Sequence, residues 1–220
     1  MDMSYWAKLT DETWGPDPLL TDTGIEQAYN VNNIRKQELS YGIPIPESFY
    51  SSPFSRTITT ALISFEGIVF GDGDNVVKSV PKAIIKEQKF RERNYRQHTC
   101  NMRRTRSFIK ETYPQFEIEP GFTEEDIFWN TTGACNETDD LLRIQVREVL
   151  DEIFENDKSC CGCYFISPLQ RFATLVVDIF ITAHAHTNRL IREVLGAPEK
   201  RMPTGGVFAM VISVTPSSAI

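Results

Sequence analysis

The sequence predicts an α/β fold, a mostly parallel sheet with helices on both faces. The pattern of the chain supports this fold, and its length and composition support a single packed domain. Short apolar runs alternate with amphipathic segments along the chain, which is the pattern of a doubly wound sheet. The 220 residues suffice for one substantial hydrophobic core but are too few for two comfortable domains. A content of 41% hydrophobic and 24% charged residues is ordinary for a packed globular protein. We therefore expect a single domain over residues 1–220.

The first half of the chain predicts a helix, a strand and a second helix in close succession. Thr21 is a suitable N-cap for an amphipathic helix that runs through Leu39. Residues 41–46 contain two prolines within three residues, which interrupt helix and sheet hydrogen bonding and therefore predict a loop. A short strand is expected at residues 48–51, and a helix at residues 55–65.

The second half continues the alternation. Residues 139–155 carry apolar side chains at helical spacing and acidic residues at their start, which predicts an amphipathic helix. The other expected elements are a strand region at 76–85 interrupted by Pro81, a helix at 103–113, a buried strand at 178–182, a helix at 187–195 closed by Gly196, and a last strand at 207–214. Residues 160–177 do not fit this alternation, and we interpret them as an insertion, either a retained intron or an extra pair of strands.

The formal net charge of −7 argues against a broad surface for nucleic acid or an anionic membrane, so neither is expected as a partner. Positive charge gathers at residues 89–96 and 103–106, which are either solvated loop and helix residues or the lining of a local anion site. Residues 1–10 contain no sustained apolar core, so we expect no secretory signal and a cytoplasmic or nuclear location.

Five cysteines in a chain without an export signal predict free thiols rather than disulfides. A zinc site would have to combine Cys160 and Cys163 with His184 and His186. A Cys-x-x-Cys spacing beside a further cysteine lacks the second matched ligand pair that typifies such sites. We expect no metal and no cofactor.

Residues 50–61 combine a strand end, a tight turn and the first turn of a helix that carries Arg56. A guanidinium pairs bidentately with phosphate, and unpaired N–H groups at the helix N-terminus would lie on the same side. His184 follows the expected strand at 178–182. Both side chains are therefore expected at the carboxyl ends of parallel strands, where ligands bind in such sheets. The alternatives are an ordinary arginine at a helix start and a structural histidine after an apolar strand.

Three short segments carry a resemblance to a known family: Leu20-Thr21-x-x-Gly24, Ser51-Ser52-Pro53-x-x-Arg56 and Ala183-His184. Together they resemble the histidine phosphatase superfamily of phosphoglycerate mutase-like proteins, most of all its fungal phosphomutase-like branch. The resemblance extends from about Tyr5 to Val214, apart from residues 160–177. It implies a three-layer phosphoglycerate mutase-like fold and phosphomonoester hydrolysis, or phosphomutation, through a phosphohistidine.

The resemblance also implies roles for single residues. Arg56 would bind the phosphate, His184 would contact it from the opposite side, and Glu92 would act as the proton donor. The alternative for Glu92 is a surface glutamate paired with Arg91 or Arg93.

A second set of residues resembles the segment that lines the substrate side of the pocket in the fungal branch. Substrate contacts are implied for His98, Arg103 and Arg104. The implied ligand is a phosphorylated small molecule.

The sequence departs from the family at the nucleophile. In the family this histidine lies in an Arg-His-Gly triplet that closes the first central strand, upstream of the segment at Leu20. The sequence as given contains no such triplet and no corresponding strand, and its histidines are His98, His184 and His186. His186 also stands where the family has a glycine.

We therefore predict a histidine phosphatase impaired by the absence of its nucleophile. A pseudophosphatase that binds a phosphorylated ligand without turnover is the main alternative. A non-functional gene product, which would aggregate or fail to melt cooperatively, is a further one.

Overall fold

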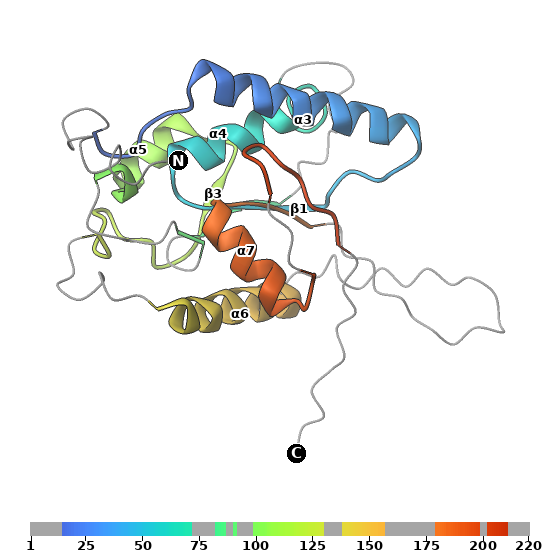
Figure 1. Cartoon of the computed structure of the whole chain (residues 1–220). Helices are drawn as coiled ribbons and strands as arrows, with labels where there is room; N and C mark the ends of the chain where they lie inside the picture. The colour runs from blue at the N-terminus through green and yellow to red at the C-terminus, as the bar shows by residue number, and fades with distance from the viewer. Residues whose placement is uncertain are drawn as a thin grey trace, which may run out of the picture.

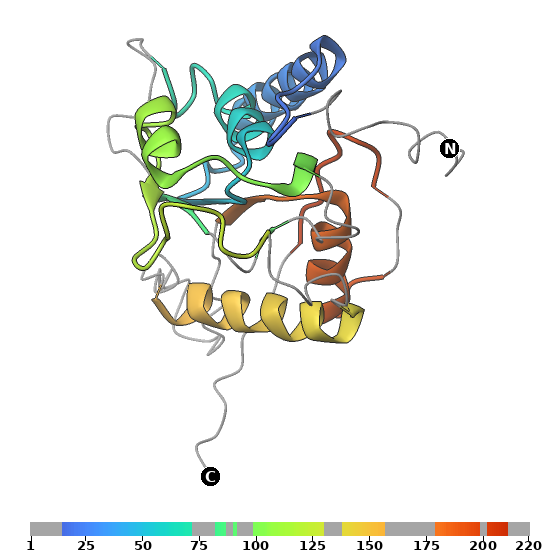
Figure 2. The same ribbon diagram turned by 90° about the vertical axis from the view of Figure 1, so that its left-hand side faces the viewer.

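The computed structural model describes residues 15–71, 82–86, 90–91, 99–129, 138–156, 179–198 and 202–210. These residues form three layers, with a parallel sheet between two groups of helices (Figure 1). Helices α3 (Asp22–Ser40), α4 (Ser55–Ser64) and α5 (Arg106–Thr112) lie above the sheet in this view, and α6 (Asp139–Asn156) and α7 (Ala185–Val194) lie below it. The view turned by 90° shows the same layers (Figure 2). The predicted α/β class with helices on both faces is confirmed.

The sheet consists of β1 (Ser48–Ser51), β2 (Lys82–Ile85), β3 (Glu117–Ile118) and β4 (Ile179–Thr182), in the order β3-β2-β1-β4. All three pairings are parallel. Ser51 of β1 is paired with Ile85 of β2 on one side and with Thr182 of β4 on the other. The carboxyl ends of these three strands therefore lie level at one edge of the sheet, which is where parallel α/β proteins place their ligands.

Each face of the sheet has its own hydrophobic core, because successive strand residues point to opposite faces. Phe49 packs in the upper core with Ile58 of α4 and with Phe65, the residue after that helix, and the rings of Phe49 and Phe65 meet edge to face at 4.8 Å. Tyr50 packs in the lower core with Val149 of α6 and Leu190 of α7. The two cores thus share the short central strand β1, whose four residues are all buried.

The predicted helices are observed with small shifts at their ends. The Thr21 hydroxyl accepts a hydrogen bond from the Gly24 N–H at 3.2 Å, which confirms Thr21 as the N-cap of α3. Helix α5 begins at Arg106, three residues later than predicted, because Thr105 caps it through the Phe108 N–H at 3.2 Å. Helix α7 begins at Ala185, two residues earlier than predicted. None of the described helices has the length and apolar character that crossing a membrane requires.

The prediction of a last strand at 207–214 is wrong for its described part, since residues 207–210 form no strand. A turn closed by the Gly206 N–H and the Pro203 carbonyl precedes them. Phe208 then lies against the Arg192 guanidinium of α7, 4.4 Å from the ring centroid, so a side-chain contact holds this segment instead of a strand ladder. The strand β3 was not predicted.

Several predictions fall on residues outside the described ranges. They concern residues 76–81 of the expected second strand, residues 211–214 of the last strand and the suspected insertion at 160–177. The single domain and the insertion therefore stay predictions.

Candidate functional site

Arg56 and His184, far apart in the sequence, lie together at the carboxyl edge of the sheet. Arg56 is in the first turn of α4, which follows β1, and His184 is the N-cap residue of α7, which follows β4. Because β1 and β4 are adjacent parallel strands, both helix starts lie over the same edge. The Nη2 atom of Arg56 is 3.4 Å from Nδ1 of His184. The expected juxtaposition of these two side chains is therefore observed, whereas their role toward phosphate stays a prediction.

The imidazole of His184 is buried, with 6% of the residue exposed. Its Nε2 atom lies 2.8 Å from the hydroxyl oxygen of Ser52, and its ring meets that of Phe54 edge to face at 5.2 Å. Burial lowers the pKa of His184 well below the ordinary histidine value, and the positive charges of Arg56 and Arg91 lower it further. The ring is therefore neutral at neutral pH.

The guanidinium of Arg56 is held on two sides. Its Nη1 atom donates a hydrogen bond to the Cys100 carbonyl at 3.0 Å, in the 3-10 helix η1 (Thr99–Asn101). The Cζ atom of Arg56 lies 4.5 Å from the centroid of the Phe54 ring. Arg56 is thus oriented by the turn that precedes α4 and by a segment more than 40 residues away.

The start of α4 is capped by Asp17, a residue that the sequence analysis missed. The buried carboxylate of Asp17 accepts hydrogen bonds from the Ser55 N–H at 2.9 Å and from the Ser55 hydroxyl at 2.6 Å. The Thr57 N–H donates to the Phe54 carbonyl at 3.0 Å. The expectation that unpaired N–H groups of this helix face an anion is therefore wrong for Ser55 and Thr57. These two N–H groups are therefore not available to an anion.

Asp17 itself has an unusual environment. Its backbone is in the left-handed region with φ of 51°, which is uncommon for a residue other than glycine. Burial raises the pKa of its carboxyl group, while the hydrogen bonds from Ser55 and the charges of Arg56 and Arg104 act in the opposite direction. The only local signal was the position of Asp17 between Pro16 and Pro18, and that pattern predicts a turn rather than a cap.

Arg91 brings a second guanidinium to the site and forms an ion pair with Asp126. The Asp126 side chain is fully buried and accepts hydrogen bonds from the guanidinium of Arg91 and from the Arg103 N–H at 2.9 Å. The Arg91 carbonyl accepts a hydrogen bond from the Thr187 hydroxyl of α7 at 2.9 Å. Arg91 therefore connects the start of α7 to the loop around Asp126.

Arg103 and Arg104, which are both predicted to contact substrate, lie in different surroundings. Arg103 is 2% exposed, and its guanidinium donates to the carbonyl oxygens of Thr123, Glu124 and Glu125. Its side chain thus organises the 123–125 loop. Arg104 is exposed and affects the pKa of Asp17, which puts its charge near the start of α4.

Glu92 and His98 lie outside the described residues, so their predicted roles stay predictions. The same holds for Cys160 and Cys163 of the zinc alternative.

His186 is turned toward α6. Its Nε2 atom lies 3.4 Å from a carboxylate oxygen of Asp139, and its Nδ1 atom lies 3.4 Å from the Arg189 guanidinium. This ring therefore belongs to the contact between α6 and α7, although it follows His184 by only two residues.

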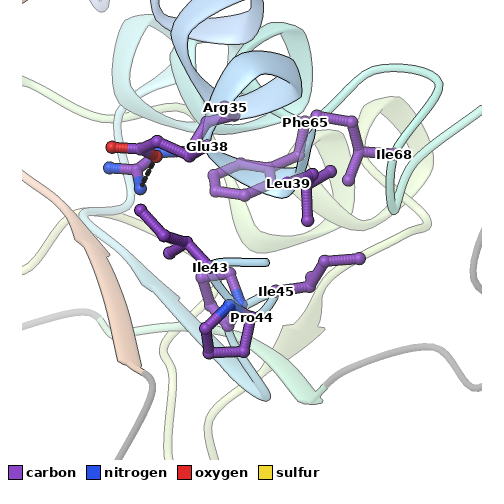
Figure 3. Close-up of a pocket in the computed structure, with 9 residues that line it drawn as sticks. Arg35, Glu38, Leu39, Ile43, Pro44, Ile45, Phe65 and Ile68 are labelled. Carbon is purple, nitrogen blue, oxygen red and sulfur yellow. Dashed lines mark hydrogen bonds and ion pairs between the residues drawn. The ribbon is translucent and has the colours of Figure 1, made fainter. Parts of the chain in front are cut away.

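A separate pocket lies beside α3, lined by residues of that helix, the following proline-containing loop and the segment after α4 (Figure 3). Leu39, Ile43, Ile45 and Phe65 make its walls mostly apolar. Its cation Arg35 is paired with Glu38 at 2.5 Å. This lining is unsuited to a phosphate group and shares no residue with the Arg56–His184 site.

No protein-family model matches this α/β chain. The chain is 31% identical to "Probable phosphoglycerate mutase" of Arthroderma benhamiae over 217 residues, which cover 97% of the chain and 57% of that protein. It is 28% identical to "Phosphomutase-like protein 3" of Candida albicans over 212 residues, which cover 96% of the chain and 57% of that protein.

The fold places the chain among α/β proteins with a parallel sheet and ligand positions at the strand ends. The chain is a homologue of phosphoglycerate mutase-like and phosphomutase-like proteins and fits the histidine phosphatase superfamily, which confirms the resemblance found in the sequence. It spans 57% of the length of these two relatives.

Proposed function

We propose that the Arg56–His184 site binds the phosphate group of a phosphomonoester, as part of a phosphatase of the histidine phosphatase type. The observation that carries this proposal is the 3.4 Å approach of Arg56 Nη2 to His184 Nδ1 at the carboxyl edge of the sheet. Arg91 adds a second guanidinium, whose positive charge also acts on the His184 imidazole. Such a group of donors matches the charge and the oxygen atoms of a phosphate.

The proposed reaction proceeds through a phosphohistidine. An imidazole nitrogen attacks phosphorus, the leaving alcohol takes a proton from Glu92, and water then hydrolyses the phosphorus–nitrogen bond. His184 and Arg56 would stabilise the charge on the transferring group. None of the three histidines of the sequence lies in an Arg-His-Gly triplet, so we propose that these 220 residues alone turn over substrate poorly or not at all.

The second candidate is a pseudophosphatase that binds a phosphorylated ligand or partner without hydrolysing it. A specific observation favours it. The described site supplies binding groups, and neither described histidine is placed as an attacking nitrogen, since His184 is held by Ser52 and Arg56 and His186 faces Asp139. Phosphomutation is a less favoured reading of the same site.

For the ligand we propose a phosphorylated small molecule. The net charge of −7 supports a local anion site over a nucleic-acid or membrane surface. A cytoplasmic or nuclear location is proposed on the sequence argument alone.

Calorimetric titration with inorganic phosphate tests the binding proposal. We expect Arg56→Ala to weaken binding by about 10-fold to 100-fold, since a hydrogen bond to a charged group contributes about 1.5–3 kcal/mol. Arg106→Ala is the matched control, because Arg106 is exposed on α5, and its binding should equal that of the wild type. Equal binding by wild type and Arg56→Ala would contradict the proposal.

A turnover assay with p-nitrophenyl phosphate separates the two candidate functions. Hydrolysis above the uncatalysed rate, even if slow, together with an acid-labile phosphoenzyme supports the impaired phosphatase. Arg56-dependent phosphate binding by a cooperatively folded protein without hydrolysis supports the pseudophosphatase.

A further inference from the structure

The Ser52 hydroxyl is in hydrogen-bond contact with His184, and the backbone N–H and carbonyl of Ser52 are both hydrogen-bonded to neighbouring segments. The residue is 0% exposed. Its N–H donates to the Thr182 carbonyl at 3.0 Å, which extends the β1–β4 pairing by one residue. Its carbonyl accepts a hydrogen bond from the Thr57 hydroxyl at 3.0 Å. The hydroxyl of Ser52 is therefore held in place by β4 and α4, the two elements that also carry or precede the site residues.

The contacts of the His184 ring define which nitrogen carries the proton. A guanidinium has only N–H donors, so Nδ1, facing Arg56 Nη2 at 3.4 Å, must be the acceptor in the neutral ring. The proton of the neutral ring is then on Nε2. Ser52 Oγ, 2.8 Å from Nε2, accepts that proton in a hydrogen bond.

We propose that Ser52 is a positioning residue for His184. It accepts the Nε2 proton of the tautomer that Arg56 selects and so holds Nδ1 toward Arg56, which makes Nδ1 the nitrogen that gains a proton when an anion binds beside Arg56. Ser52 accepts from Nε2 in the neutral and in the protonated ring, and therefore it does not oppose that protonation. The role of Ser52 toward the ring does not depend on the proposed function. That the anion is a phosphate does depend on it.

A hydroxyl at hydrogen-bond distance from a neutral imidazole also has the form of an activated nucleophile. The geometry around Ser52 argues against that role. Its side chain is fully buried beneath the ring, and its carbonyl and N–H are both engaged by the scaffold. The hydroxyl thus supports the imidazole from the side away from Arg56.

The test is the ¹⁵N spectrum of the full chain labelled at histidine, with the His184 signals assigned through His184→Gln. We expect wild-type His184 to show a protonated Nε2 and an unprotonated Nδ1 at neutral pH. In Ser52→Ala the Nε2–H loses its acceptor, so the His184 signals should shift and broaden as the ring becomes free to turn away from Arg56. Ser51→Ala is the matched control, because Ser51 is an equally buried neighbour whose hydroxyl donates to the Ser52 carbonyl instead. Its His184 signals should match those of the wild type.

Two results would overturn the proposal: a wild-type ring protonated on Nδ1, or His184 signals that are unchanged in Ser52→Ala. The first is measured on the wild type alone, so it remains decisive if Ser52→Ala does not fold. Ser52→Cys, which keeps the shape of the side chain but replaces the hydroxyl by a somewhat larger and weaker acceptor, then serves as the second variant.

Titration with inorganic phosphate adds a functional readout. We expect Ser52→Ala to bind about fivefold more weakly than Ser51→Ala, as for the loss of one hydrogen bond. If wild type binds no phosphate, the proposed function fails, while the ¹⁵N spectrum still decides the role of Ser52.

Discussion

The protonation state of His184 determines how the site meets an anion. Burial and two neighbouring arginines lower the pKa of this ring, so it is neutral when the site holds no ligand. A bound anion supplies negative charge beside Arg56 and raises the pKa of His184, because it stabilises the protonated ring. Anion binding should therefore be accompanied by uptake of a proton.

We expect the affinity for sulfate, whose charge is constant in this range, to rise as the pH falls from about 8 to about 5. The rise should approach about tenfold for each pH unit between the pKa values of His184 in the bound and the free protein. Calorimetry on His184→Gln should show much less of this dependence, whereas His186→Gln should retain it, because His186 faces Asp139 of α6. A flat profile for wild type, or the same profile for His184→Gln, would refute the prediction.

The lowered pKa of His184 also affects folding stability. An unfolded chain takes up a proton on this histidine near its ordinary pKa of about 6.5, and the folded chain does not. The contribution to stability is therefore present above about pH 6.5 and is lost as the pH falls toward the pKa of the folded state. Sulfate titrations at low pH should be accompanied by a check that the protein is still folded.

At the scale of elements, the sequence predicted those whose signals are local. Thr21 marked the start of α3, and the apolar spacing of residues 139–155 marked α6. The approach of Arg56 to His184 followed from the rule that adjacent parallel strands end at one edge. By contrast, β3 has two residues and no pattern of its own, so only its pairing with β2 defines it.

The cap of α4 could not be predicted for the same reason, since Asp17 is 38 residues away from Ser55 in the sequence. The usual signal, a polar side chain at the N-cap itself, is absent because Phe54 occupies that position. Ser52 was visible in the sequence, but a serine beside a proline only indicates a turn. These contacts depend on the folded arrangement of distant segments.

Asp17→Ala should destabilise the protein by about 1–2 kcal/mol, because it removes a helix cap and leaves the buried Ser55 N–H without its acceptor. Asp17→Asn keeps one acceptor oxygen and should cost less. Urea unfolding measures both. Asp140→Ala is the control, since the side chain of Asp140 is 89% exposed and its removal should change stability by less than about 0.5 kcal/mol. Equal stability of Asp17→Ala and wild type would show that Asp17 does not stabilise α4.

For the whole molecule, the two cores on opposite faces of the sheet suggest one cooperative unit. Phe49 and Tyr50 are neighbours in β1, yet Phe49 packs against α4 and Tyr50 packs against α6 and α7. Loss of either helical layer would therefore expose one face of the same four-residue strand. We expect the described layers to unfold together.

Ile58→Ala in the upper core and Leu150→Ala in the lower core test this expectation. Ile58 is 0% and Leu150 3% exposed, so each change should lower the free energy of unfolding by about 2–5 kcal/mol. Because both cores share β1, each variant should lower the single midpoint that near-ultraviolet and far-ultraviolet circular dichroism report together. Two separate transitions, with only one of them shifted by each variant, would instead show that the layers unfold independently and that the chain is not one domain.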